Sequence, residues 1–177
     1  MSKLYFFYGA MNAGKSALLL QNNHNYVSLG MKTLLYIPEI TKTDFISSRT
    51  GLKERATPFN DSYLFNDIPD DINAIFIDES QFLSKKQVIS LCKLVDYHNV
   101  QVYCYGIRSD FRGEMFEGVK YLMTLSDVIT EIKNVCRCGR KATMNSRIIS
   151  NPEQVELNKN VYQSMCRKCF YEDNPLI

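Results

Sequence analysis

Eight residues near the start of the chain have the types and spacing of a phosphate-binding loop. Residues 9–16 read Gly-Ala-Met-Asn-Ala-Gly-Lys-Ser and fit the pattern G-x-x-x-x-G-K-[ST] at every fixed position. Glycines let such a loop curl until successive backbone N–H groups face the oxygens of a polyphosphate. Lys15 adds a positive charge for the terminal phosphates, and the hydroxyl of Ser16 is a ligand for Mg²⁺. The pattern predicts nucleotide binding by Gly9, Ala10, Met11, Asn12, Ala13, Gly14, Lys15 and Ser16.

Two carboxylates come directly after the apolar run of residues 74–77. That run is typical of a buried parallel strand, whose carboxyl end would present Asp78 and Glu79. We expect Asp78 in the magnesium shell and Glu79 within reach of an attacking hydroxyl, as its proton acceptor. An ATPase would use a similar glutamate to activate water. These two residues alone therefore leave a kinase and an ATPase open.

Four of the six cysteines form two short pairs. Cys136-x-Cys138 and Cys166-x-x-Cys169 are separated by a polar stretch, a spacing that suits a tetrahedral zinc site. Because four thiolates close the coordination sphere, such a zinc would be structural and would supply folding energy to the C-terminal segment. The alternative is a set of reduced surface cysteines. The two remaining cysteines lie on apolar faces and are predicted to be core residues.

The elements that must position these groups follow from apolar periodicity. Strands are predicted at residues 3–7, 32–37, 74–77 and 100–105, and helices at 16–29 and 84–98. This alternation predicts an α/β fold of the P-loop NTPase type, with a doubly wound, mainly parallel sheet. We place a nucleotide-binding domain at residues 1–135 and a small zinc-binding domain at 136–177.

Residues 39–61 break this periodicity. Thr, Ser, Lys, Arg and Gly dominate there, which predicts a long loop or an extended hairpin beside the phosphate site. Long loops in this position are often lids. We interpret Arg49, Lys53 and Arg55 as solvated surface charges, with a phosphate-clamping role as the alternative.

Composition limits the classes of protein to which the chain can belong. The 177 residues carry a net charge of +2, from 21 basic and 19 acidic residues, which is too even to indicate a nucleic-acid or membrane surface by itself. No apolar run approaches membrane-spanning length. We expect a cytoplasmic protein, whose cysteines are reduced.

Five segments carry further information: residues 8–16, 78–82, 104–116, 136–142 and 162–169. In this order they resemble the type II thymidine kinases, the small zinc-containing enzymes of bacteria and of animal cytosol. The resemblance covers nearly the whole chain and implies phosphoryl transfer from ATP with Mg²⁺ to the 5′-hydroxyl of thymidine, giving dTMP for DNA precursor synthesis. It also implies a homotetramer, feedback inhibition by dTTP and a structural zinc ion. The Cys-x-Cys spacing of the first pair occurs in the bacterial branch of the family.

The resemblance also implies roles for individual residues. Glu79 would be the catalytic base, and MgATP would be held by residues 9–16 together with Asp78, Glu79, Ser80 and Gln81. A loop at about residues 153–162 would cover the nucleoside, although it lacks the Gly-Gly pair common in the family and is about one residue shorter. The thymine base would be enclosed by Met11, Phe82, Ile107, Phe111, Phe116 and Tyr162.

Two other functions stay open at this stage. One is a P-loop kinase for another nucleoside, such as deoxyuridine or deoxycytidine. The other is a zinc-knuckle ATPase that binds nucleic acid, prompted by the basic residues of segments 136–140 and 167–168. Against the second, the sequence has no basic stripe with interleaved aromatic residues.

Overall fold

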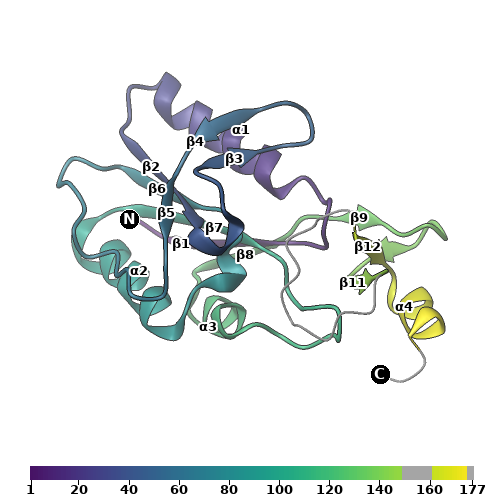
Figure 1. The fold of residues 1–177 in the computed structure, drawn as a ribbon. Coiled ribbons are helices and arrows are strands. Elements are labelled where there is room, and N and C mark those ends of the chain that lie inside the picture. Colours follow the sequence, from purple (N-terminus) through teal and green to yellow (C-terminus); the bar gives the residue numbers. More distant parts are fainter. Residues whose placement is uncertain (149–160, 175–177) are drawn as a thin grey trace.

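The computed structural model describes residues 1–148 and 161–174, and its central element is a six-stranded sheet (Figure 1). The strand order is β5-β2-β6-β7-β1-β8, and every neighbouring pair is parallel. The strands of this sheet are β1 Leu4–Tyr8, β2 Thr33–Pro38, β5 Thr57–Phe59, β6 Ala74–Ile77, β7 Gln101–Gly106 and β8 Val128–Glu131.

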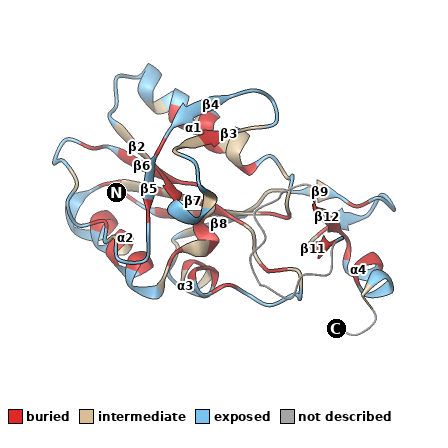
Figure 2. Cartoon of the chain, viewed as in Figure 1, coloured by how far each residue is buried: buried red, intermediate tan, exposed pale blue. Residues whose placement is uncertain are grey.

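Helices cover both faces of the sheet, which confirms the predicted doubly wound α/β class (Figure 1). On one face α1 (Lys15–Ser28) buries Leu19 and Leu20 against a cluster that contains Phe76. On the other face α2 (Lys85–His98) and α3 (Glu117–Leu125) pack on the apolar side chains of the strands. Figure 2 shows the buried residues concentrated in this sheet and on the helix faces turned toward it.

Local signals place α2 as the sequence predicts. The side chain of Ser84 accepts a hydrogen bond from the backbone N–H of Gln87, and the side chain of Gln87 accepts one from the N–H of Ser84. This capping box satisfies two donors at a helix start and fixes its first residue. The carboxyl end of the helix stops at Asn99, whose φ of 56° is left-handed.

The segment 39–61 is more ordered than the sequence predicts. A short 3₁₀ turn, η1 (Glu39–Thr41), leads into a hairpin of β3 (Phe45–Ser47) and β4 (Lys53–Arg55). The expectation of a loop or hairpin was incomplete, because β5 follows and joins the edge of the main sheet beside β2. An edge position tolerates Pro58, which has no N–H to donate.

The chain after β8 forms two small antiparallel sheets and a helix at one end of the main sheet (Figure 1). Their apolar cluster is built around three of the cysteines and includes Ala10 of the phosphate-binding loop. Most of the predicted covering loop, residues 153–160, lies outside the described residues. No helix in the described ranges is both long and apolar enough to cross a membrane. The elements of this part are β9 Asn134–Val135, β10 Lys141–Ala142, β11 Met144–Arg147, β12 Tyr162–Met165 and α4 Arg167–Asp173.

Candidate active site and cysteine cluster

The phosphate-binding loop joins β1 to α1 and has the curled backbone that its glycines predict. Asn12 and Gly14 have positive φ values of 64° and 84°, and the amino end of α1 begins at Lys15. The Nζ of Lys15 donates to the carbonyl oxygens of Ala10, at 2.9 Å, and Gly9, at 3.4 Å. The ammonium group therefore lies over the loop, where a polyphosphate would meet both it and the positive end of the helix dipole.

The hydroxyl of Ser16 and the carboxylate of Asp78 lie side by side at the carboxyl ends of β1 and β6. Ser16 Oγ donates to Asp78 Oδ2 over 2.7 Å, and Asp78 is 3% exposed. Oxygen donors of this kind are the ligands that Mg²⁺ prefers. The two residues therefore fit a magnesium site next to the loop.

Glu79 is held in a left-handed backbone conformation just after β6, with φ 49° and ψ 41°. Gln81 Nε2 donates to Glu79 Oε2 over 2.7 Å, while the N–H of Ile107 donates to Gln81 Oε1 over 3.2 Å. Since a backbone N–H can only donate, this second bond fixes which end of the Gln81 amide faces the carboxylate. Gln81 is 3% exposed and ties Glu79 to the end of β7.

Glu79 shares one cavity of about 190 Å³ with all six residues predicted to enclose a base. Asp78 and Gln81 also line it, at the side of the phosphate-binding loop. The rings of Phe82 and Phe116 meet edge to face, with centroids 5.8 Å apart. Ser80 of the predicted MgATP set is buried and lies outside this lining, in the 3₁₀ turn η2 (Ser80–Phe82). The base-enclosing residues of the cavity are Met11, Phe82, Ile107, Phe111, Phe116 and Tyr162.

Arg147 of β11 links two of these aromatic residues across the chain. Its guanidinium carbon lies 3.8 Å from the centroid of the Phe111 ring and 5.2 Å from that of Tyr162. Its Nη2 also donates to the phenol oxygen of Tyr162 over 2.7 Å. Stacked guanidinium groups are attracted to ring faces, so Arg147 holds both rings in place at the cavity.

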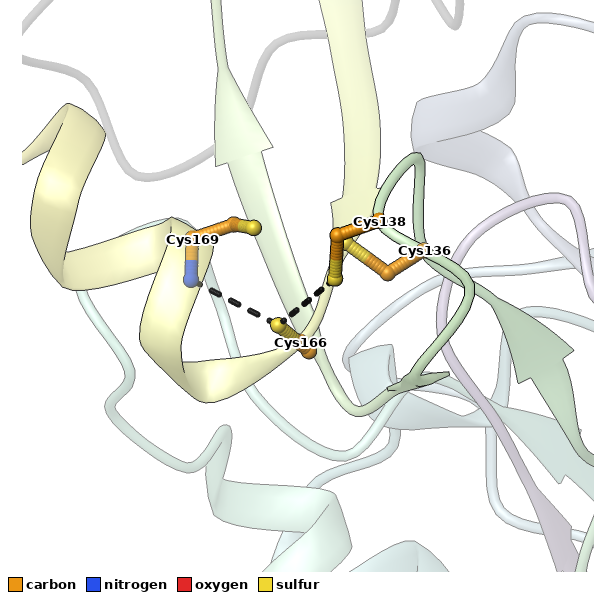
Figure 3. Close-up of side chains that lie close together, drawn as sticks. All are labelled: Cys136, Cys138, Cys166 and Cys169. Carbon is orange, nitrogen blue, oxygen red and sulfur yellow. Dashed lines mark hydrogen bonds between the residues drawn. The ribbon is translucent and has the colours of Figure 1, made fainter.

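The four paired cysteines converge on one point, as Figure 3 shows. Their sulfur atoms all lie within 4.8 Å of one another, and those of Cys138 and Cys166 are 3.6 Å apart. Zinc–sulfur bonds of about 2.3 Å in a tetrahedron place the sulfurs about 3.8 Å apart, so the cluster fits a zinc ion. A disulfide would need the sulfurs at about 2.05 Å. Cys104, outside the cluster, is buried as predicted, and Cys92 is half-buried.

Backbone groups favour thiolates in the cysteine cluster. The N–H groups of Cys138 and Cys166 lower the pKa of Cys136 to about 6. The N–H of Cys169 likewise lowers the pKa of Cys166. The thiols of Cys138 and Cys166 raise the pKa of Cys169 to about 12, since a further thiolate among sulfurs is unfavourable. A bound cation removes that penalty, which is why a metal suits this cluster.

Comparison with known proteins decides the family. A family profile described as "Thymidine kinase" matches residues 2–170 of the chain. The chain belongs to the thymidine kinase family. The thymidine kinase of Zymomonas mobilis subsp. mobilis is 45% identical, over 97% of this chain and 97% of its own length. That of Escherichia coli K12 is 44% identical, over 97% of this chain and 92% of its own. That of Yersinia pseudotuberculosis is 43% identical, over 97% and 96%.

Membership of the thymidine kinase family confirms the resemblance seen in the five motifs. The cavity is also lined by residues that lie outside these motifs. Four of the additional lining residues come from η1, the hairpin strand β3 and the turn between them, and two others are buried polar residues. Segment 39–61 was predicted to lie beside the phosphate site, but its irregular composition did not indicate which of its residues would line the cavity. Asn145 lies in a short polar strand whose residues 145–147 are all buried, so no local pattern marked it. The cavity residues missed by sequence reasoning are Ile37, Thr41, Thr43, Phe45, Ser47, Asp110 and Asn145.

Proposed function

We propose that the protein is a thymidine kinase that transfers the γ-phosphoryl group of ATP to the 5′-hydroxyl of thymidine, giving dTMP and ADP. The observation that carries this proposal is the shared cavity. Its lining includes a carboxylate, Glu79, next to the phosphate-binding loop, and an aromatic enclosure for a flat base. A nucleoside in that cavity would present its hydroxyl to the carboxylate and to the terminal phosphate together.

In this proposal each polar residue has a separate task. Backbone N–H groups of residues 9–16 and the ammonium group of Lys15 bind the phosphates and offset charge as the phosphoryl group moves. Glu79 accepts the proton of the 5′-hydroxyl, and Gln81 holds its carboxylate in place. The aromatic rings exclude water from the base and fix the hydroxyl for in-line attack.

Two metal ions are part of the proposal. Ser16 and Asp78 would hold Mg²⁺, which neutralises charge on the β- and γ-phosphates. Cys136, Cys138, Cys166 and Cys169 would hold a structural zinc ion, whose binding free energy contributes to folding. The zinc-binding domain is proposed to span residues 136–177 and the nucleotide-binding domain residues 1–135, although β9 before this boundary pairs with β10 after it.

The assembly, regulation and location are proposed from the family resemblance. They are a homotetramer, feedback inhibition by dTTP and residence in the cytoplasm. Exposed apolar side chains near the end of α1 support subunit contacts there, with Val27 52% and Leu29 75% exposed. The thiols of the cysteine cluster suit a reducing compartment. Sedimentation of the purified protein, with and without dTTP, tests the proposed assembly.

One observation disfavours the nucleic-acid-binding alternative. Three basic residues of the C-terminal part are already paired with acidic groups. Arg137 lies 2.7 Å from Asp173, Lys141 lies 2.7 Å from Glu131, and Lys168 lies 3.6 Å from Glu172. Paired charges contribute little to phosphate binding, so this surface is poorly suited to a nucleic-acid backbone.

The test is ATP consumption with and without thymidine, with the product identified in the same reaction. We expect thymidine-dependent formation of ADP, matched by an equal amount of dTMP. Deoxyuridine and deoxycytidine serve as competing acceptors and decide between thymidine and another nucleoside. ATP turnover indifferent to any nucleoside would overturn the proposal, and salt-sensitive DNA binding would then favour the ATPase alternative.

A further inference from the structure

Both backbone polar groups of Met11, in the phosphate-binding loop, form hydrogen bonds with side chains of the C-terminal part of the chain. The N–H of Met11 donates to Asn145 Oδ1 over 2.7 Å. The carbonyl oxygen of Met11 accepts from Ser164 Oγ at 2.7 Å and from Asn134 Nδ2 at 2.9 Å. Both polar groups of this loop residue are therefore bound by side chains more than a hundred positions away.

The three side chains that bind Met11 are themselves held in place by hydrogen bonds and by strand pairing. Asn134 Nδ2 also donates to Ser164 Oγ over 3.0 Å. Asn145 and Ser164 are directly opposite each other on the paired strands β11 and β12. Asn145 Nδ2 donates to the carbonyl of Ser109 over 3.1 Å, which leaves its oxygen to face Met11. Asn145 is 2% and Ser164 9% exposed, so water competes little with these bonds.

The hydrogen bonds to Met11 determine the direction of the N–H of Asn12. In a trans peptide the C=O and the following N–H point in opposite directions. The carbonyl of Met11 is fixed toward Ser164 and Asn134, so the N–H of Asn12 is directed away from them. Asn12 has a left-handed φ of 64°, a conformation that a residue with a side chain holds only when its surroundings require it. Without these hydrogen bonds, the peptide between Met11 and Asn12 is free to rotate, and its N–H then no longer faces a bound phosphate.

Apolar contact connects the same two parts. Ala10, the neighbour of Met11, is 5% exposed and belongs to the buried cluster that contains Cys136, Cys166 and Cys169. Strand β12 contributes Met165 to this cluster and pairs with β11. Their position depends on the segment that the cysteines hold together.

We propose that Ser164, Asn134 and Asn145 are positioning residues for the phosphate-binding loop, so that the strands beside the cysteine cluster set the affinity for ATP. The proposal rests on the assignment of this loop as the ATP site. It gives the C-terminal part a second task, separate from covering the nucleoside. Asn145 also lines the cavity, whereas Ser164 and Asn134 do not, so the latter two isolate the effect on the loop.

The experiment is titration of the full-length, zinc-loaded protein with MgADP, which reports on the loop without any phosphoryl transfer. Ser164→Ala is expected to weaken MgADP binding about fivefold, equivalent to the roughly 1 kcal/mol of one hydrogen bond. Asn134→Ala is expected to act in the same direction. Ser164→Thr keeps the hydroxyl on a strand position and is expected to restore the affinity.

Ser146→Ala is the matched control, because Ser146 is a buried serine of β11 whose hydroxyl bonds to Asn174 instead of the loop. Melting temperature and zinc content, measured for each variant, separate lost positioning from lost folding. Unchanged MgADP affinity in both Ser164→Ala and Asn134→Ala, or an equal loss in Ser146→Ala, would overturn the proposal. So would a wild-type protein that does not bind MgADP. A wild type that binds MgADP, shows the expected pattern and fails to phosphorylate thymidine would support this inference while refuting the proposed function.

Discussion

Glu79 has a carboxylate that lines the cavity and a backbone conformation that is unusual for a residue with a side chain. Its left-handed backbone, at φ 49° and ψ 41°, costs about 1–3 kcal/mol for a residue that is not glycine. The conformation is stabilised by the bond from Gln81 and by the bond of its own N–H to Asp78 Oδ1 at 3.0 Å. Because strain of this kind persists only where the surroundings require it, the geometry supports a functional role for the carboxylate at the carboxyl end of β6.

Glu79→Gln tests that role directly. The change keeps the shape of the side chain but removes the proton acceptor, so kcat is expected to fall by about two to four orders of magnitude. Dissociation constants for MgADP and thymidine, measured by titration, are expected to stay within a few-fold of wild type. Loss of MgADP affinity at normal thymidine affinity would show that Glu79 serves the metal instead.

Gly106→Ala tests the support behind Glu79. A Cβ at this position would lie 2.8 Å from Gln81 Oε1 and 2.8 Å from Ser80 Oγ, closer than real contacts allow. Gln81 must then shift, and we expect kcat to fall about tenfold or more while KM for ATP changes less. Steady-state kinetics with each substrate varied separately measures this split.

Gly30→Ala is the control for that substitution. Gly30 has a φ of 76° and nothing within 4 Å of its Cβ position, so alanine strains only the backbone. We expect a lower melting temperature with unchanged kcat. If Gly106→Ala behaved like this control, Gln81 would have no part in catalysis.

At the scale of elements, α3 approaches the site through a glycine. A Cβ on Gly118 would lie 2.3 Å from the carbonyl oxygen of Leu83, immediately after η2. The close approach brings Phe116, which precedes the helix, to the ring of Phe82 in the cavity wall. The position of α3 thereby sets the shape of the proposed nucleoside site.

Gly118→Ala is expected to destabilise the protein by about 1–3 kcal/mol, since the contact is with backbone and cannot be relieved by a rotamer. The direction of the change in the free energy of unfolding is informative, because helix propensity alone would favour alanine over glycine by about 1 kcal/mol. Urea unfolding measures the change. Thr124→Ala, an exposed position on the same helix, is expected to stay within about 0.5 kcal/mol of wild type, and a stabilised Gly118→Ala would contradict the packing described.

Among the described residues, the sequence predicted four of the six strands of the main sheet and two of the three helices that cover it; strands β5 and β8 and helix α3 were not predicted. Helix α2 lies within one residue of its expected bounds, because the cap at Ser84 and the apolar spacing act within single turns. Strand β5 was missed, since Thr57, Pro58 and Phe59 have no clear β pattern and owe their strand to pairing with β2. Such pairing joins segments distant in the chain and leaves no local period to read.

The same distinction holds for the site. The loop of residues 9–16 and the carboxylates after β6 were predicted from spacing alone, because each is a run of consecutive residues, and the structure brings the two runs together at Ser16 and Asp78. Phe45 and Asn145 were missed, since each reaches the cavity only through the tertiary position of its strand. The interaction of Arg147 with the Phe111 ring was missed for the same reason.

At the scale of the whole molecule, the cysteine cluster replaces the core that the C-terminal part lacks. Among the described residues its buried apolar cluster has seven members, three of them cysteines and one, Ala10, from the phosphate-binding loop. So few apolar groups do not hold a segment together without a further constraint. The zinc ion proposed for the four sulfurs would supply that constraint.

Cys138→Ser is expected to reduce bound zinc below one per chain and to weaken thymidine binding. A serine hydroxyl replaces a thiolate poorly as a zinc ligand, and the C-terminal strands lose their anchor. Zinc content by mass spectrometry, thymidine titration and circular dichroism measure the outcome; tyrosine fluorescence also serves, as the chain has no tryptophan.

Cys92→Ala is the matched control, because Cys92 is a half-buried cysteine outside the cluster. It is expected to leave zinc content and thymidine affinity unchanged. Normal stability and normal thymidine affinity in Cys138→Ser would refute the zinc assignment.

The hydrogen bonds to Met11 also have a consequence for the synthesis of the chain on the ribosome. Ser164 lies 153 positions after Met11, so a ribosome that adds about 5–20 residues per second needs roughly 8–31 s between the two. Until Asn134, Asn145 and Ser164 have been added in turn, the loop lacks side chains that bind Met11. On the positioning role proposed above, full affinity for nucleotide is reached only after Ser164 has been added to the chain.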